Sequence, residues 1–125
     1  MAIDPRGADL KRMLAEDDGG PLVMLNLLRF VEGGREQYNE YVRVFGEMVP
    51  ERYGAELIYY GDGSTVLVAE PGQEWDAVLI VRYPNREAFS RMVADPDYHE
   101  ISHLRGSALS EAVLQATVPR GPTGT

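Results

Sequence analysis

The two histidines of the chain lie four residues apart, in the string H-E-I-S-H from His99 to His103. In a helix this spacing puts both imidazoles on one face, and zinc peptidases use the same H-E-x-x-H pattern for two metal ligands and a general base. Leu109 stands where an extended motif has its third histidine, and a chain of 125 residues leaves no second lobe for a peptidase cleft. The string therefore favours histidines at a cavity edge or on the surface, with a metal site on His99 and His103 as the weaker alternative.

A polar side chain interrupts the apolar run of residues 22–30, which has the composition of a buried strand. This residue is Asn26, and the two-residue period of a strand sends it to the face opposite that of Arg29. Asn26 either hydrogen-bonds a neighbouring loop or lines a ligand cavity. Arg29, near the end of the run, is predicted to be a surface or salt-bridge residue.

A second candidate, Arg82, follows the unbroken apolar run of residues 77–81, which predicts a strand covered on both faces. Arg82 shares one face of that strand with Asp76. Its guanidinium either pairs with an acid such as Asp76 or Glu56, or binds an anionic group of a ligand.

Two tyrosines, Tyr38 and Tyr41, lie one turn apart on the apolar stripe of a helix predicted over residues 35–48. Pro50 and Gly54 mark the end of this helix. Aromatic residues at such positions either pack in the core with the hydroxyl at its rim, or line a cavity, because the same geometry serves both roles.

The order of the elements indicates the fold class. Helices are predicted over residues 4–18, 35–48, 86–94 behind the cap residue Asn85, and 97–105 behind Asp95-Pro96. Strands are predicted over residues 22–30, 56–60, 65–69, 77–81 and 111–118, the second and third forming a hairpin through the D-G step at 62–63. This order predicts an α+β sandwich, an antiparallel sheet with helices on one face.

The other face of this sheet is expected to stay apolar. It would include Met24, Leu28 and residues of the 77–81 run, either 78 and 80 or 79 and 81. An exposed apolar face of that kind is most simply covered by a second copy of the chain. The sequence therefore predicts a homodimer.

The composition limits the other functional classes. A net charge of −8 argues against a nucleic-acid partner, and no apolar run has the roughly 20 residues of a membrane span. The chain has no cysteine and no visible secretory signal, so a cytoplasmic protein is expected. One domain is predicted over residues 21–118, with an N-terminal extension over 1–20 and a disordered tail over 119–125.

Short segments spread along the chain resemble a known family. They are Tyr38 and Tyr41, R-Y-G-A at 52–55, R-Y-P-N-R-E-A at 82–88, and D-P-D-Y at 95–98 followed by Arg105. Together they are similar, over residues 22–118, to the domain of unknown function 1330 (DUF1330) family of the dimeric α+β barrel superfamily. The resemblance implies a ferredoxin-like fold in which two sheets face each other across a dimer, with a cavity between each sheet and its helices or loops. It implies no particular reaction, and no cofactor is predicted.

The first functional hypothesis is a homodimeric protein that binds an unknown small molecule, and that works as a cofactor-independent enzyme if it is catalytic. Its candidate ligand-binding residues are Asn26, Tyr38, Tyr41, Arg82, Tyr98 and Arg105. His99 and His103 are the candidate catalytic residues, because histidine is the residue type that titrates nearest neutrality. In this hypothesis Arg82 holds an anionic group and Asn26 orients a carbonyl. The alternative is a non-catalytic binding or assembly module without a useful pocket.

Overall fold

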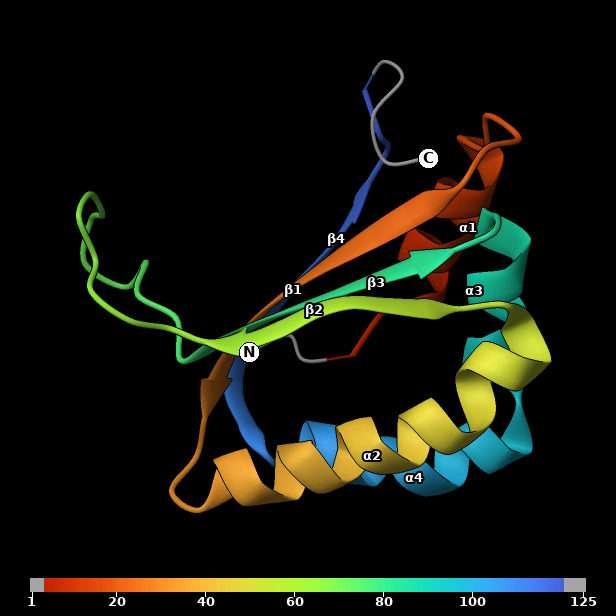
Figure 1. Ribbon diagram of the computed structural model, residues 1–125. Helices are drawn as coiled ribbons and strands as arrows, with labels where there is room; N and C mark the ends of the chain where they lie inside the picture. Colours follow the sequence, from red (N-terminus) through yellow and green to blue (C-terminus); the bar gives the residue numbers. More distant parts are fainter. Residues whose placement is uncertain (1–3, 121–125) are drawn as a thin grey trace.

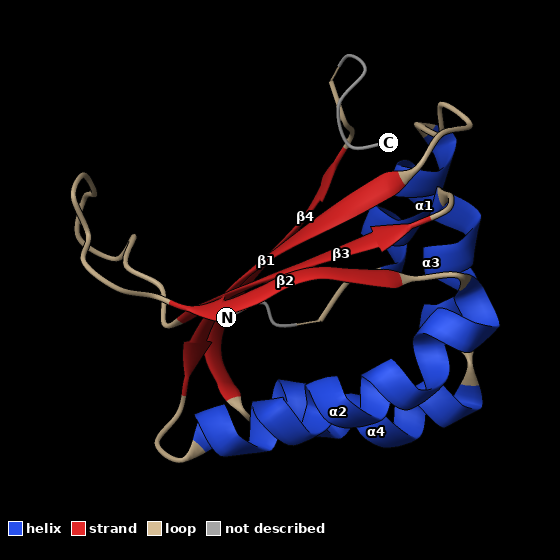
Figure 2. Ribbon diagram, in the orientation of Figure 1, coloured by secondary structure: helices blue, strands red, loops and turns tan. Residues whose placement is uncertain are grey.

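The structure, a computed structural model, describes residues 4–120. Its elements follow in the order α1 (Gly7–Ala15), β1 (Leu22–Phe30), α2 (Gly34–Tyr53), β2 (Glu56–Asp62), β3 (Ala77–Tyr83), α3 (Arg86–Ala94), α4 (Pro96–Gly106) and β4 (Leu109–Thr117). The strands form one antiparallel sheet in the order β2-β3-β1-β4. Figure 2 shows the helices on one side of this sheet, which confirms the predicted α+β sandwich.

Strand β1 lies inside the sheet, paired with β3 on one side and β4 on the other. Its alternate residues Leu22, Met24, Asn26 and Leu28 are buried on the side of the helices. The prediction that Met24 and Leu28 lie on the uncovered face is therefore wrong. Both faces of β1 are apolar, so its sequence pattern did not specify which face the helices cover.

The face without helices, called the open face here, carries the remaining residues of the central strands. These are only partly buried and mostly apolar: Val23, Leu25 and Leu27 of β1 and Val78 and Ile80 of β3. The register pairs Leu25 with Ile80 and Leu27 with Val78, which makes a continuous apolar surface. Of the two alternatives for the 77–81 run, the structure selects Val78 and Ile80.

Helices α3 and α4 begin at the predicted caps. The Asn85 side chain accepts a hydrogen bond from the Ala88 amide at 2.8 Å, and the Asp95 side chain accepts one from the Asp97 amide at 2.9 Å. Pro96, at the start of α4, fits there because the first helical residues have no partner for an amide. Local capping chemistry thus determines where the chain turns between α3 and α4.

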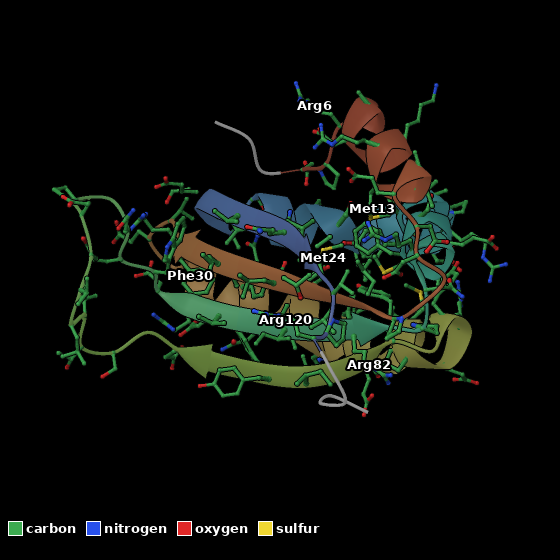
Figure 3. The ribbon with its side chains drawn as sticks, turned by 90° about the horizontal axis from the view of Figure 1, so that it is seen from above. Arg6, Met13, Met24, Phe30, Arg82 and Arg120 are labelled. Carbon is green, nitrogen blue, oxygen red and sulfur yellow. The ribbon has the colours of Figure 1, made fainter. Side chains whose placement is uncertain are left out.

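The helices cover the sheet in two pairs. Helices α2 and α4 run side by side under it (Figure 1), and the Gln37 amide donates a hydrogen bond to the Leu104 carbonyl at 3.1 Å. Helix α1 contacts α3, where Arg86 donates to the Met13 carbonyl at 3.1 Å. Met13 joins Met24 in the buried core (Figure 3), so α1 packs on the domain. Residues 121–125 of the predicted tail lie outside the described residues.

The predicted strand over residues 65–69 is wrong. Strand β2 pairs directly with β3, and residues 63–76 between them form a loop without strand or helix. Figures 1 and 3 both show this loop projecting beyond the end of the sheet. A strand needs a neighbour for its backbone groups, and the loop has left the sheet that would supply one. Its apolar side chains are consequently exposed, with Leu67 at 89% and Val68 at 95%.

Arg29 anchors the base of this loop to β1. Its Nε lies 2.9 Å from a carboxylate oxygen of Glu111, and its guanidinium stacks 4.6 Å from the ring centre of Trp75. It also donates hydrogen bonds to the carbonyls of Gly72, at 2.9 Å, and Glu74. The prediction that Arg29 is a salt-bridge residue is confirmed.

Within residues 4–120, no helix is long and apolar enough to cross a membrane.

Two glycines of α2 have opposite surroundings, and this gives a matched test of the fold. A Cβ on Gly34 would collide with the backbone carbonyl of Ala108, whereas a Cβ on Gly46 would meet open space. We expect Gly34→Ala to lower the free energy of unfolding by about 1–3 kcal/mol through overpacking. Gly46→Ala should raise it by about 0.5–1 kcal/mol through helix propensity. Denaturant titration of both variants measures this, and equal effects would contradict the close approach of α2 to residue 108.

Candidate functional site

A cavity of about 290 Å³ lies between the helix side of the sheet and the helices. Its apolar wall comes from β1, β3, α2 and α3 and includes Met24, Phe45, Leu79, Val81, Phe89 and Met92. This volume is at the small end of the roughly 300–1,000 Å³ that is typical of ligand sites. Its size therefore suits a small molecule with an apolar body.

Polar groups from several elements converge on this wall. The side-chain nitrogen of Asn26 donates a hydrogen bond to the Leu79 carbonyl at 3.2 Å. Its side-chain oxygen is the atom that can accept a hydrogen bond from a ligand. The hydroxyls of Tyr41 and Tyr98 lie 2.7 Å apart, in hydrogen-bond contact. Arg105 is buried in the wall, 3.3 Å from a carboxylate oxygen of Asp4.

The tyrosines around the cavity are held neutral by burial. Burial raises the pKa of Tyr41 well above its ordinary value. Electrostatic repulsion between its ionised form and the neighbouring phenols of Tyr98 and Tyr38 raises this pKa further. Burial likewise raises the pKa of Tyr98, although its hydrogen bond with Tyr41 and the Arg105 guanidinium oppose the shift. These phenols therefore serve as hydrogen-bond donors and acceptors near neutral pH, and a role as ionised bases does not fit them.

The sequence comparisons identify the family. Residues 31–117 match the family described as domain of unknown function DUF1330, which is more than half of the chain. This chain belongs to the DUF1330 family. No curated protein matches it in sequence.

Solved structures share the fold of this DUF1330 protein. A protein of unknown function from Rhodopseudomonas palustris has a TM-score of 0.84 at 33% identity, covering 96% of this chain and 98% of that one. A protein described as dimeric, ferredoxin-like and of unknown function, from Jannaschia sp., has a TM-score of 0.61 at 14% identity and covers 80% and 100%. A nipsnap family protein of unknown function from Agrobacterium tumefaciens has a TM-score of 0.57 at 20% identity and covers 84% and 95%. At their low identities the last two show the fold alone, and that fold is ferredoxin-like.

The DUF1330 cavity brings together four of the predicted ligand-binding residues, Asn26, Tyr41, Tyr98 and Arg105, with His99. Tyr38 is not among its lining residues. It is fully buried behind them, where its ring packs against Phe30 and Tyr41 at centroid distances of 5.7 and 5.2 Å. Of the two alternatives for Tyr38, the structure therefore places it in the core and not in the lining of the cavity.

Arg82 lies away from the cavity. It points to the open face, opposite Val23 of β1 and Glu56 of β2. Its guanidinium is 3.7 Å from the Glu56 carboxylate, so the predicted pairing with an acid across the sheet is found and the hypothesis that placed Arg82 in the cavity does not fit. The strand period makes this unavoidable, because Val81 and Tyr83 occupy the helix side.

The two histidines of α4 have different surroundings. His99 lines the cavity, and its Nε2 lies 2.7 Å from the Val93 carbonyl, which can only accept a hydrogen bond. In neutral His99 the proton-accepting nitrogen is then Nδ1. Both histidines are exposed, but His103 lies outside the cavity lining. In the described part of the chain no group of three or more histidine, aspartate or glutamate side chains is placed to hold a metal ion.

Sequence reasoning missed three residues of the cavity wall. Asp4 and Pro5 form part of the wall although they precede α1, and Ser102 completes the wall on α4. Nothing in the residue types around Asp4 signals a contact with Arg105, which is 101 positions away. Such a contact follows only from the path of the folded chain.

The buried tyrosines predict a loss of stability at high pH. Burial raises the pKa of Tyr38, Tyr41, Tyr83 and Tyr98 above the ordinary value of 10.0, so the unfolded chain releases these protons first. The contribution of these tyrosines to the free energy of unfolding should stay level below pH 10 and then fall, by up to about 1.4 kcal/mol per pH unit for each tyrosine. Denaturant titrations at stepped pH, with tyrosinate absorbance, measure this.

Tyr41→Phe provides the control for this titration. It removes one of the four phenols and should make the decline above pH 10 shallower by about one tyrosine's contribution. Titration of all tyrosines near pH 10 in a protein that stays folded would contradict their burial.

Proposed function

We propose that this DUF1330 protein binds a small, largely apolar molecule in the cavity between its sheet and helices. The observation that carries the proposal is the wall itself, in which apolar side chains line about 290 Å³ and a few polar groups converge from different elements. Sites of this composition are the usual form of small-molecule pockets, where polar groups orient a ligand and apolar groups bind its body. Asn26, Tyr41, Tyr98 and Arg105 are the proposed orienting groups.

If the protein is catalytic, His99 is the acid or base that the geometry favours. It lines the cavity, whereas His103 does not. The hydrogen bond from Nε2 of His99 to the Val93 carbonyl fixes the orientation of the ring. It leaves Nδ1 as the nitrogen that can accept a proton. The alternative of an assembly module without a pocket is disfavoured by the cavity beside His99.

Three further predictions stay open to test: a metal site on His99 and His103, a cytoplasmic location, and the absence of a nucleic-acid partner.

Filling the cavity tests this function. Ser102 lies in the cavity wall, and Ser110 is exposed outside it; each hydroxyl donates to a backbone carbonyl, at 3.0 and 3.3 Å. We expect Ser102→Phe to weaken the binding of phenylacetate and phenylacetamide by about ten-fold or more. Ser110→Phe should leave binding unchanged. Ligand-observed NMR titration measures both, and a chain that binds neither probe, or binds them equally in both variants, would refute a ligand site here.

We also propose that the protein works as a homodimer joined through the open face. The face presents Val23, Leu25, Leu27, Val78 and Ile80 as one apolar surface without a helix over it (Figure 2). A patch of this kind is costly to leave in water, and a second copy covers it with the same residues. The Jannaschia protein of the same fold is described as dimeric, which supports this arrangement.

A charge in the open face should break the dimer. Ile80→Glu places a carboxylate opposite Leu25, where burial without a partner costs about 3 kcal/mol or more and should raise the dissociation constant by about a hundred-fold. Leu14→Glu makes the same kind of change at an exposed position of α1 and should leave the dimer intact. Size-exclusion chromatography with light scattering gives the masses. A monomeric wild-type protein, or a dimeric Ile80→Glu variant, would contradict this interface.

A further inference from the structure

Arg105 is a buried guanidinium on the cavity wall. It belongs to the last turn of α4 and is 5% exposed. Burying a cation is costly unless anions or hydrogen-bond acceptors compensate it. The planar fork of arginine matches the two oxygens of a carboxylate better than any other side chain does. An arginine buried beside an apolar cavity is therefore a suitable anchor for a carboxylate.

A carboxylate of the same chain already contacts this anchor. The Oδ1 atom of Asp4 lies 3.3 Å from the Nη1 atom of Arg105, longer than the roughly 2.7–2.9 Å of a tight charge-assisted hydrogen bond. The Asp4 side chain is 72% exposed, whereas that of Arg105 is 6% exposed. Asp4 thus reaches a buried partner from the solvent-facing side, and a pair with one partner in water stabilises the fold little.

The segment that carries Asp4 is part of the wall and is outside the regular elements. Asp4 and Pro5 line the cavity just before α1 begins at Gly7. Figure 3 shows the segment leading to α1 at the margin of the domain, beside the sheet. This segment can leave the cavity without breaking a strand or a helix.

The rest of the wall suits an acid with an apolar body. In the described range 4–120, the acidic and basic side chains of the wall are Asp4, His99 and Arg105. Aromatic and aliphatic groups such as Phe45, Phe89 and Leu114 surround the remaining space. A volume of about 290 Å³ leaves room for a single ring or a short branched chain.

We propose that the cavity binds a small carboxylic acid with an apolar, ring-sized body, whose carboxylate takes the place of Asp4 on Arg105. This inference rests on the proposed small-molecule function and names the class of ligand. Asp4 is then an internal competitor: it contacts Arg105 while the cavity is empty and is displaced when an acid enters. The acid and Asp4 then compete for the same Nη1 donor of the buried guanidinium.

The test compares an acid and its amide on full-length chains. Phenylacetate carries the carboxylate and phenylacetamide has nearly the same shape without the charge, so NMR titration near neutral pH isolates the contribution of the charge. Phenylacetate should bind at least about ten-fold more tightly, as expected for a hydrogen-bonded charged group. Asp4→Asn removes the competitor and should tighten phenylacetate binding by about two- to five-fold, the scale of a partly exposed ion pair.

Asp62→Asn is the matched control. Asp62 is another exposed aspartate paired with an arginine, Arg35, but it lies at the end of β2 and is not a lining residue. The control has the same change in net charge and should leave the affinity for phenylacetate unchanged. Arg105→Lys keeps the positive charge without the fork and should weaken phenylacetate binding more than phenylacetamide binding. Thermal unfolding checks that each variant is folded, and Asp4→Asn remains decisive if Arg105→Lys does not fold.

The outcomes separate this inference from the function on which it rests. Tighter phenylacetate binding in Asp4→Asn, with no change in Asp62→Asn, would support it. Equal binding of acid and amide, or an Asp4→Asn variant that binds phenylacetate no better than the wild type, would overturn the ligand class. If Ser102→Phe still weakens the binding of the probes, the cavity remains a ligand site of another class. If neither probe binds any of these chains, the proposed function fails together with the inference.

Discussion

The pairing of β1 with both β3 and β4 is the constraint on which the rest of the structure depends. It places β1 inside the sheet, so one set of its side chains must lie under the helices and the other must form the open face. The first set brings Met24 and Asn26 to the cavity, and the second brings Leu25 and Leu27 to the proposed dimer interface. The proposed ligand site and the proposed dimer interface therefore share one strand without sharing a side chain.

Three arginines show how the position of a side chain decides its role in an acidic chain. Arg29 closes the base of the projecting loop through Glu111 and Trp75, and Arg82 pairs with Glu56 at the edge of the open face. Both are partly exposed, where an ion pair contributes little. Arg105 alone of the three is buried in the cavity wall, where the surrounding tyrosines are kept neutral and the low polarity strengthens any contact with an anion. This position is what makes Arg105 the proposed anchor for a carboxylate.

The regular elements could be predicted where local chemistry specifies them. Strand β1 has the predicted bounds Leu22–Phe30, and the caps Asn85 and Asp95 begin α3 and α4 as expected, because each depends on a few consecutive residues. The strand predicted over residues 65–69 failed for the opposite reason. Its β-branched composition is suited to a strand, but a strand exists only where another one pairs with it, and β2 pairs with β3 instead.

By itself the sequence determined most of the elements, the family, and the residues Asn26, Tyr41, Tyr98 and His99 as candidates that the cavity does bring together. These residues lie in local patterns that limit where their side chains can point. Only the tertiary structure decided that the helices cover the Met24 face of β1, that Arg82 lies on the opposite side, and that Asp4 reaches Arg105. Both faces of the sheet are apolar, and Asp4 and Arg105 are 101 residues apart, so none of these outcomes is encoded in a local pattern. They arise from the packing of the whole chain.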